Sequence, residues 1–459
     1  MSFVNEHLFW YYASMENTQK VVTRFAPSPT GKLHSGAYRT AIFSYLYARK
    51  HNGTFVLRIE DTDKERSTKE YEDNIMESLQ WMGIDHDIFV RQSENVERHQ
   101  TILEKMIADG FAYISKEEAK DGSGVIKEIV RFKNPNEDIT FHDEIKGSVT
   151  MNTTDLGDFV IAKNIREPLF HLAVVVDDFD VGVTHVVRGE DHVSNTPRQI
   201  LIQRAIGAPT PTYAHLPLVL GSDKQKLSKR KGALALTEYR DLGYLPEALL
   251  NMVAMVGWNP GTEQELFSKD ELIQEFELSK VQKSPAMFNP EKLDWFNREY
   301  IKKLDSAAFW NHVAPWLPSE MSANQDMLIK IEHLLRDRIE KFSDAKELLE
   351  NEFDYFFKAP TIDTKMIVWK TLKEDPEGLT KTKDYLKHVH ELLESIVETE
   401  WYSETRVVVM PYAEQEGKGN VLWPLRVSLS GKEKSPDPFE LMGILGKQET
   451  LARIAAVLD

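Results

Sequence analysis

Two short motifs hold the residues of this chain that are best suited to chemistry on a phosphate. Residues 24–37 read RFAPSPTGKLHSGA, and residues 224–232 read KQKLSKRKG. The first motif contains the ring N–H of His34, and the second contains the ammonium groups of Lys226 and Lys229. Such donors and cations can stabilise the negative charge that gathers on a phosphoryl group under attack. In this order, the two motifs predict an enzyme that activates a carboxylate with ATP.

The first motif has the layout of a phosphate-binding turn. Residues 21–26 are apolar and β-branched, which predicts a strand, and the prolines and glycine of residues 27–31 end it. A helical pattern begins at Gly36, so His34 stands at a helix N-terminus, where backbone N–H groups and the helix dipole favour an anion. Gly36 would let a base or ribose approach the backbone. The alternative is an ordinary strand–helix turn with a chance histidine.

The second motif is a basic loop. Its alternative interpretation is a solvated surface loop, which is what most lysine clusters are. The preceding residues, AHLPLVLGSD, are apolar and predict a strand, so the loop stands at a strand end. In open parallel sheets, ligands bind at that end of the strands.

The two motifs resemble the nucleotide-binding motifs of class I aminoacyl-tRNA synthetases. They correspond to His34-Ser35-Gly36-Ala37 and to residues 226–230, KLSKR. Further segments resemble bacterial-type glutamyl-tRNA synthetases, and the resemblance extends from Val21 to the C-terminus. These segments are RFAPSPTG, RIEDTD (58–63), VVDD (175–178), THVVRGEDHVSNTPRQ (184–199), LPEALLN (245–251), GWN (257–259), WPLRVSLSG (423–431) and FELMGILGKQETLARI (439–454).

The resemblance implies a two-step reaction. Glutamate attacks the α-phosphate of ATP, which carries Mg²⁺, and the glutamyl group then passes to a ribose hydroxyl of the tRNA 3′-terminal adenosine. His34 and Lys229 would stabilise the transition state with support from Lys226, and Ser228 would order the loop. The ATP-binding residues expected on this basis are Pro27, Gly36, Glu190, Ser228 and Lys229.

The same resemblance implies a glutamate site. Arg24 and Arg188 would surround the side-chain carboxylate, because a guanidinium can donate two parallel hydrogen bonds to it. Glu60 and Ser28 would bind the ammonium group. The alternatives are structural ion pairs for both arginines, and a structural role for Glu60 within its acidic segment. Where relatives often carry Tyr, this chain has Phe170, which removes a hydroxyl that could contact glutamate.

The expected fold class is α/β: a Rossmann-type parallel-sheet catalytic domain with an α+β insertion, followed by an all-α C-terminal region that binds the anticodon. Runs such as LAVVVDD and THVVRGE predict strands of the catalytic sheet. The expected boundaries are an extension at 1–20, the catalytic domain at 21–97 and 166–233, an acceptor-binding insertion at 98–165, a stem-contact region at 234–325 and the anticodon-binding region at 326–459.

Composition limits the location and the metal content of the protein. No apolar run approaches the ~20 residues that span a bilayer, and the chain has no cysteine. We therefore expect a cytoplasmic protein without disulfides, without membrane contact and without a structural zinc. A monomer is the default expectation. The net charge of −17 gives no support for tRNA binding, which rests on the resemblance. The aromatic segment before Met15 is either a misassigned start or a small appended helix.

The sequence allows alternatives for the tRNA partner and for the role of Arg338. The expected partner is tRNA-Glu, but a relaxed enzyme would also charge tRNA-Gln. Arg338 corresponds to an arginine with which relatives read the last anticodon base, and its alternative is a solvated helix residue. A different class of function, an RNA-binding protein that has lost catalysis, is disfavoured because His34, Lys226, Lys229 and both arginines are present.

Overall fold

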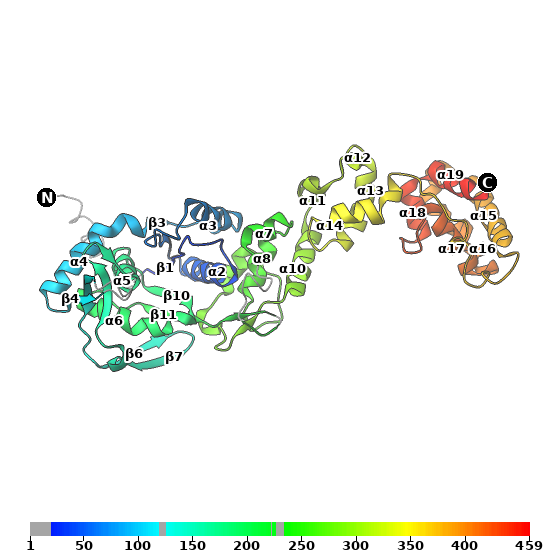
Figure 1. Ribbon diagram of the computed structural model, residues 1–459. Helices are drawn as coiled ribbons and strands as arrows, with labels where there is room; N and C mark the ends of the chain where they lie inside the picture. The colour runs from blue at the N-terminus through cyan, green and yellow to red at the C-terminus, as the bar shows by residue number, and fades with distance from the viewer. Residues whose placement is uncertain (1–19, 119–124, 222, 226–233) are drawn as a thin grey trace. The chain divides into compact units, whose positions relative to one another are not determined.

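The protein forms two compact units. The computed structural model describes residues 20–118, 125–221, 223–225 and 234–459. Unit 1 extends to Asn297, and unit 2 begins at Arg298. Unit 1 is built on a mainly parallel sheet, and unit 2 is helical (Figure 1). The predicted segment before Met15 lies outside the described residues.

The large sheet of unit 1 has seven strands in the order β3-β2-β1-β10-β11-β6-β7. All neighbouring pairs are parallel except β6 and β7, which form an antiparallel hairpin. The α/β class with a Rossmann-type parallel sheet is therefore confirmed. The strands are β1 (Val22–Phe25), β2 (Thr54–Ile59), β3 (Ile88–Arg91), β6 (Asp138–Asp143), β7 (Gly147–Asn152), β10 (His185–Gly189) and β11 (Thr212–Leu216).

The first strand–helix–strand segment follows the prediction. Helix α2 (Ser35–Lys50) connects β1 to β2, and its apolar face, with Tyr38, Ile42 and Leu46, is buried. Helix α3 (Lys69–Trp81) begins where Thr68 accepts a hydrogen bond from the Tyr71 N–H at 3.3 Å, because a threonine before the first turn satisfies an otherwise unpaired donor.

The run LAVVVDD is helical, so its prediction as a strand was wrong. It lies in α5 (Phe170–Asp180), whose residues 172–178 are all buried. A continuous apolar run of this length fits a buried strand and a buried helix equally well, and the valines favoured the strand. Here α5 packs between α4 (Val96–Ala108), α6 (Thr196–Ile206) and a second sheet, so apolar residues are needed on every side.

The second sheet is antiparallel, with the order β4-β5-β8-β9. Together with α4 and the β6–β7 hairpin, it accounts for the mixed α+β pattern of residues 98–165. The hairpin extends the large sheet, because β6 pairs with β11 through Tyr213 and Asp143. The strands are β4 (Ala112–Glu118), β5 (Ile126–Phe132), β8 (Phe159–Asn164) and β9 (Glu167–Pro168).

The rest of unit 1 is mostly helical. A short strand pair, β12 (Val219–Leu220) with β13 (Ala286–Met287), connects it to the segment that follows β11. Gly257, at φ +80°, lies where a Cβ would meet the Arg39 side chain at 2.9 Å, so only glycine suits this turn. The helices are α7 (Leu236–Asp241), α8 (Pro246–Ala254), α9 (Lys269–Glu275) and α10 (Pro290–Lys303), which ends in unit 2.

Unit 2 is helical, as the periodicity of the C-terminal sequence predicts. Its buried side chains include Leu386 on α15, Val409 on α16 and Leu425 on α17. The further helices are α11 (Ser306–Val313), α12 (Ser319–Ser322), α13 (Gln325–Arg338), α14 (Asp344–Glu347), α15 (Gly378–Glu394), α16 (Trp401–Glu416), α17 (Lys418–Ser430), α18 (Pro438–Leu445) and α19 (Lys447–Leu458).

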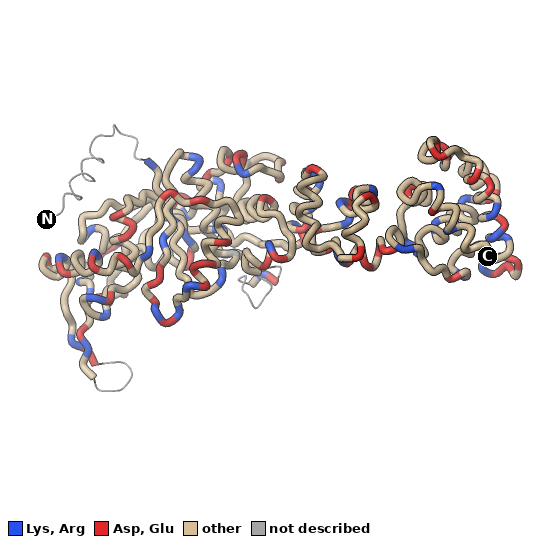
Figure 2. The backbone as a smooth tube through the Cα atoms, turned by 90° about the horizontal axis from the view of Figure 1, so that it is seen from above, with Lys and Arg blue, Asp and Glu red and all other residues tan. Residues whose placement is uncertain are grey.

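The charge of −17 is spread along the chain. Figure 2 shows acidic and basic residues interspersed along the described backbone of each unit, without long blocks of one sign. Local contacts therefore decide where an anion binds, and the total charge does not.

Candidate active site

A cavity of about 370 Å³ lies in unit 1 at the ends of the central strands. It gathers eight of the site residues predicted from sequence, and it adds others that were not predicted. The predicted residues in its lining are Arg24, Pro27, Ser28, His34, Gly36, Glu60, Phe170 and Arg188. The remaining lining residues include Phe25, Arg39, Thr40, Gly189, Asp191, His192 and residues 216–219.

The parallel sheet explains why residues so distant in sequence meet here. Arg24 is near the carboxyl end of β1, Glu60 directly follows β2, Arg188 is near the end of β10, and Leu216 ends β11. Parallel neighbours bring their carboxyl ends to one edge of the sheet, where open α/β folds bind ligands. The cavity therefore occupies the position expected for an active site.

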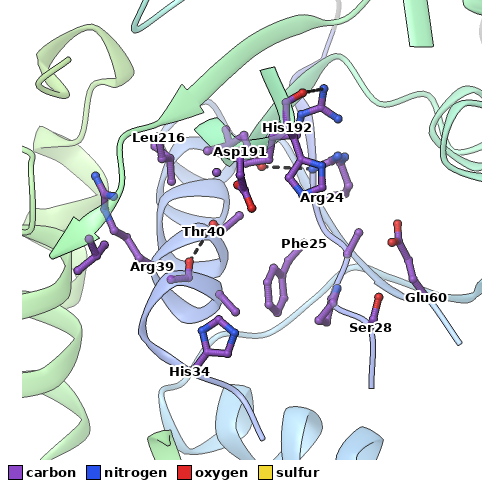
Figure 3. A pocket seen from close by; sticks show the side chains of 18 of the residues that line it. Arg24, Phe25, Ser28, His34, Arg39, Thr40, Glu60, Asp191, His192 and Leu216 are labelled. Atoms are coloured by element: carbon purple, nitrogen blue, oxygen red, sulfur yellow. Dashed lines mark hydrogen bonds between the residues drawn. The ribbon is translucent and has the colours of Figure 1, made fainter. Parts of the chain in front are cut away.

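Figure 3 shows the two ends of the cavity. His34 lies at one end as the residue preceding α2, and Arg24, His192 and Glu60 lie toward the other end. A Cβ added at Gly36 would meet only the His34 ring, at 3.9 Å, so the protein's own packing does not require glycine there. That space is open to a ligand, as the sequence predicts for Gly36.

Arg24 is fixed by two acceptors. Its Nε donates to Asp178 Oδ2 at 3.4 Å, and its Nη1 donates to the Val187 carbonyl at 3.2 Å. Within the described part of the chain, no acceptor meets its Nη2. Arg24 therefore keeps N–H groups on both terminal nitrogens for a ligand carboxylate, which suits a two-pronged contact.

The protein uses more of the N–H groups of Arg188 than of Arg24. Its Nε donates to His215 at 3.1 Å, and its Nη1 donates to Gln199 at 2.7 Å. Its Nη2 donates to Thr196 at 2.8 Å and to the His192 carbonyl at 3.4 Å. One N–H of Nη1 is left over, so this geometry supports a single hydrogen bond to a ligand and not two.

Arg188 is also a buried cation without a carboxylate partner among the described residues. Burial lowers the pKa of Arg188 to about 10, because the charged form loses its hydration. The side chain lies over the Tyr213 ring at 5.3 Å. A buried charge that the protein leaves unpaired favours a ligand of opposite sign.

Glu60 faces the same end of the cavity. Its Oε1 accepts from Arg58 Nη2 at 3.1 Å. Burial raises the pKa of the Glu60 carboxyl, and Arg58 opposes that shift. Ser28, which lies in the turn after β1, is exposed at the cavity wall. These two side chains give a cationic group of a ligand an acidic and a hydroxyl partner.

Several predicted residues lie elsewhere. Glu190 is not part of the cavity lining; its carboxylate accepts from Lys146 and, at 2.9 Å, from the Leu218 N–H. Arg338 belongs to unit 2, where it pairs with Glu352 at 2.5 Å. The predicted loop residues Lys226, Ser228 and Lys229 lie outside the described residues.

A buried ion network that the sequence does not predict lies behind the arginines. Arg58, which is 1% exposed, contacts Asp178 at 2.5 Å and lies 3.9 Å from Asp177. Burial raises the pKa of the Asp178 carboxyl, but Arg58 and Arg24 outweigh this and hold it below its ordinary value. The sequence signal for this network is the pair of aspartates at the end of the apolar run LAVVVDD, because carboxylates next to buried residues need cationic partners.

Two further properties concern membranes and metals. No helix in the described ranges has the length and apolar character that a membrane crossing requires. In the same residues, no group of three or more His, Asp or Glu side chains is placed to hold a metal ion.

Family models match both units of the chain. The catalytic domain of class I tRNA synthetases (E and Q) matches residues 20–121 and 114–295. An anticodon binding domain matches residues 308–458. These matches agree with a parallel-sheet unit 1 and a helical unit 2.

The chain also aligns with individual proteins over nearly its whole length. It is 40% identical to a glutamate–tRNA ligase from Aquifex aeolicus, covering 96% of this chain and 99% of that relative, and 39% identical to one from Nitrosomonas europaea, with the same coverage. A crystal structure of a glutamate tRNA ligase from Elizabethkingia meningosepticum, in complex with its amino acid, superposes with a TM-score of 0.83 at 31% identity, covering 96% of this chain and 99% of that one. This chain therefore belongs to the glutamate–tRNA ligase family of class I aminoacyl-tRNA synthetases.

Proposed function

We propose that this protein is a glutamate–tRNA ligase that joins L-glutamate to tRNA-Glu with ATP. The observation that carries the proposal is the arginine pair of the cavity, Arg24 and Arg188. Arg24 lies at the end opposite His34 and the start of α2 (Figure 3), and Arg188 contacts the carbonyl of His192, which lies at the same end as Arg24. An amino acid with a second carboxylate fits the arginine end, and a phosphate fits a helix N-terminus.

The reaction proceeds in two displacements. An oxygen of the glutamate α-carboxylate attacks the α-phosphorus of ATP, the new P–O bond forms, and pyrophosphate leaves. The 2′-hydroxyl of the terminal adenosine of tRNA then attacks the carbonyl carbon, AMP leaves, and the hydroxyl proton passes to the departing phosphate or to water. Positioning and charge stabilisation suffice for both steps, because the adenylate is already a good acyl donor.

The nucleotide end of the site is assigned by family correspondence and by position in the cavity. His34 donates to the phosphate under attack, while Pro27 and Gly36 bound the space for the nucleoside. Lys226 and Lys229, ordered by Ser228, stabilise the developing charge. Glu190 acts on ATP indirectly, since its carboxylate holds the Leu218 N–H beside the cavity.

The amino-acid end follows from the donors that remain available. Arg24 makes the two-pronged contact with the side-chain carboxylate, and Arg188 adds one hydrogen bond. Glu60 and Ser28 bind the ammonium group. Phe170 covers the carboxylate with a ring that cannot donate.

Mg²⁺ enters the site on the phosphates of ATP, where it would neutralise part of their charge. The carboxylates in the cavity lining are those of Glu60 and Asp191. A cysteine-based structural zinc has no ligands in a chain without cysteine.

The regions around the catalytic domain complete the proposal. Residues 98–165 hold the acceptor end of tRNA, residues 234–325 contact its stem, and residues 326–459 bind the anticodon, with Arg338 contacting the last anticodon base. The match of an anticodon binding domain to residues 308–458 supports the assignment of residues 326–459 to anticodon binding. We further propose a cytoplasmic monomer, which agrees with a chain that contains no cysteine.

Charging of labelled glutamate onto separate tRNA-Glu and tRNA-Gln transcripts tests the function. We expect product with tRNA-Glu only, and His34→Ala as a control should abolish it. Product with both would establish the relaxed alternative, and product with neither would refute the proposal.

A further inference from the structure

A buried aspartate–histidine pair stands behind Arg188, on the side away from the cavity. Arg188 Nε donates to His215 Nε2 at 3.1 Å, and His215 Nδ1 lies 2.5 Å from Asp143 Oδ2. The His215 and Asp143 side chains are both 0% exposed. Neither residue lines the cavity. Arg188 is thus the end of a three-residue chain of hydrogen bonds that begins on β6.

Strand pairing creates this chain of contacts. Arg188 is the register partner of His215 across β10 and β11, and Asp143 is the register partner of Tyr213 across β6 and β11. The three side chains therefore come from three adjacent strands of one sheet. The Tyr213 ring stacks on the His215 ring, with centroids 5.8 Å apart and planes 10° apart. This packing fixes the plane of the imidazole.

The proton positions follow from the partners. An arginine Nε can only donate, so His215 Nε2 accepts from it, and the ring proton is on Nδ1. The Thr196 hydroxyl, 3.2 Å from the same Nε2, can donate its proton to that nitrogen or to the His192 carbonyl, so it is compatible with this assignment.

Asp143 is the acceptor for the Nδ1 proton of His215. Its carboxylate also accepts from the backbone N–H groups of Ile145 at 2.9 Å, Lys146 at 2.7 Å and His215 at 3.1 Å. Four donors therefore hold Asp143 in its ionised form.

The electrostatics agree with this assignment. Burial lowers the pKa of His215, and Arg188 adds to the effect, while Asp143 opposes it. Burial raises the pKa of the Asp143 carboxyl, but the hydrogen bond from His215 and the backbone donors keep it below its ordinary value. Near neutral pH, the pair is a neutral imidazole held by a carboxylate.

We propose that Asp143 and His215 are positioning residues for Arg188, and that they determine the affinity for glutamate by directing the one remaining Arg188 N–H into the cavity. The inference rests on the proposed function. A rotation of the Arg188 guanidinium would break existing hydrogen bonds, because Thr196, Gln199 and the His192 carbonyl already accept from its other terminal N–H groups. The competing interpretation is that the pair only stabilises the sheet.

Two substitutions at His215 separate these interpretations. His215→Gln places an amide oxygen near the former Nε2 and keeps an acceptor for Arg188. His215→Asn places its amide near the former Nδ1, so it keeps a donor to Asp143 and loses the acceptor for Arg188. We expect His215→Asn to raise KM for glutamate roughly tenfold or more, in line with the loss of a charged hydrogen bond, and His215→Gln to stay close to the native value.

Asp143→Asn tests the proton assignment directly. If its amide oxygen keeps the backbone N–H groups of Ile145 and Lys146, its NH₂ faces His215 Nδ1. The ring proton then moves to Nε2, where it opposes the Arg188 N–H. Nitrogen-15 signals of labelled histidine should report the Nδ1–H form in the native protein and the Nε2–H form in this variant. Asp87→Asn, at the exposed end of another strand, is the matched control and should change neither readout.

The readouts are KM for glutamate, KM for ATP and kcat in tRNA-Glu charging, together with calorimetric binding of glutamate to the full-length protein. A selective rise in KM for glutamate in His215→Asn and Asp143→Asn supports the inference. Equal values in His215→Asn and His215→Gln, or an Nε2–H signal in the native protein, would overturn it. If the native protein neither binds glutamate nor charges tRNA-Glu with it, the proposed function is refuted. If the native protein does both and the variants leave the KM for glutamate unchanged, only the positioning role of Asp143 and His215 is refuted.

Discussion

Arg58 and Asp178, which are 120 residues apart in sequence, form an ion pair of 2.5 Å inside unit 1. Asp178 also accepts from Arg24 at 3.4 Å, so one carboxylate supports both a fully buried arginine and an arginine of the cavity. The pair connects β2, which Glu60 directly follows, with α5, which carries Phe170. The glutamate end of the cavity therefore rests on a charged core.

Removing the Asp178 carboxylate should destabilise the protein strongly. Asp178→Ala leaves two buried arginines short of a partner, which costs roughly 3–5 kcal/mol in the free energy of unfolding. Asp180→Ala, on the same helix, removes only the more exposed pair with Arg98 and should cost about 1 kcal/mol or less. Urea denaturation of both variants measures the difference, and equal losses would contradict it.

Phe170→Tyr should lower KM for glutamate about two- to tenfold, the effect of one added hydrogen bond. Phe170 lines the cavity, with its ring 5.7 Å from the His192 ring, so a hydroxyl at its tip would reach the space beside the arginines. Steady-state charging at varied glutamate provides the measurement. Phe179→Tyr adds the same hydroxyl to a similarly exposed ring of α5 outside this cavity. An unchanged KM in Phe170→Tyr would refute the prediction.

Arg338→Ala should weaken discrimination between tRNA-Glu and tRNA-Gln by roughly tenfold, the scale of one lost base contact, without changing KM for glutamate. Arg338 pairs with Glu352 and lies over the Phe353 ring at 5.1 Å, so it must exchange Glu352 for a base. The ratio of charging rates on the two transcripts measures the effect. Arg406→Ala is the matched control, because Arg406 also combines a carboxylate partner with a phenylalanine ring. A similar change in both variants would argue against a specific role for Arg338.

Acid should destabilise unit 1 through two half-buried histidines, His171 and His185. Burial lowers the pKa of His171 to about 4, with Arg198 adding to the shift, and burial lowers the pKa of His185 to about 4, with His51 adding. The pKa of a histidine in the unfolded chain is near 6.5. Between about pH 6.5 and pH 4, these two histidines are therefore protonated in the unfolded chain but neutral in the folded protein. Stability therefore falls as the pH is lowered through this window.

After allowance for partial exposure, each histidine should account for roughly 1 kcal/mol between pH 7 and pH 5. Denaturation midpoints of the native protein, His171→Asn and His185→Asn across this range provide the test. Each substitution should flatten the dependence on pH. The exposed His142→Asn serves as the control and should leave it unchanged. If the stability of His171→Asn depends on pH as steeply as that of the native protein, His171 does not contribute to the acid sensitivity.

The first half of the catalytic sheet could be predicted from sequence because its signals are local. The β-branched run of β1, the proline-rich turn and the periodicity of α2 each specify their own element. Helix α5 could not be predicted, because its apolar run satisfies a buried strand as well as a buried helix. Only the packing of α4 and α6 around it decides between them.

The residues of the site, like the elements of the fold, could be predicted only where the signal is local. Motifs identified Arg24, Glu60 and Arg188, since each stands in a recognisable segment. Asp143 and His215 carry no local signal, because their role depends on strand register across β6, β11 and β10. Glu190 is predicted from its segment as an ATP-binding residue, but it is not part of the cavity lining, and the direction of its carboxylate depends on Lys146, a residue 44 positions away.

The strand order has a consequence for the growing chain. β1 pairs with β10 through Thr23 and His185, so one edge of β1 has no sheet partner until more than 160 residues have followed it. At ordinary rates of synthesis, that interval is on the order of ten seconds or more. During this time, β1, β2 and β3 present an unpaired parallel edge, which is the kind of surface that aggregates or recruits a chaperone. We expect nascent chains arrested before His185 to be bound by chaperones more strongly than chains arrested after Leu216, in which that edge is covered.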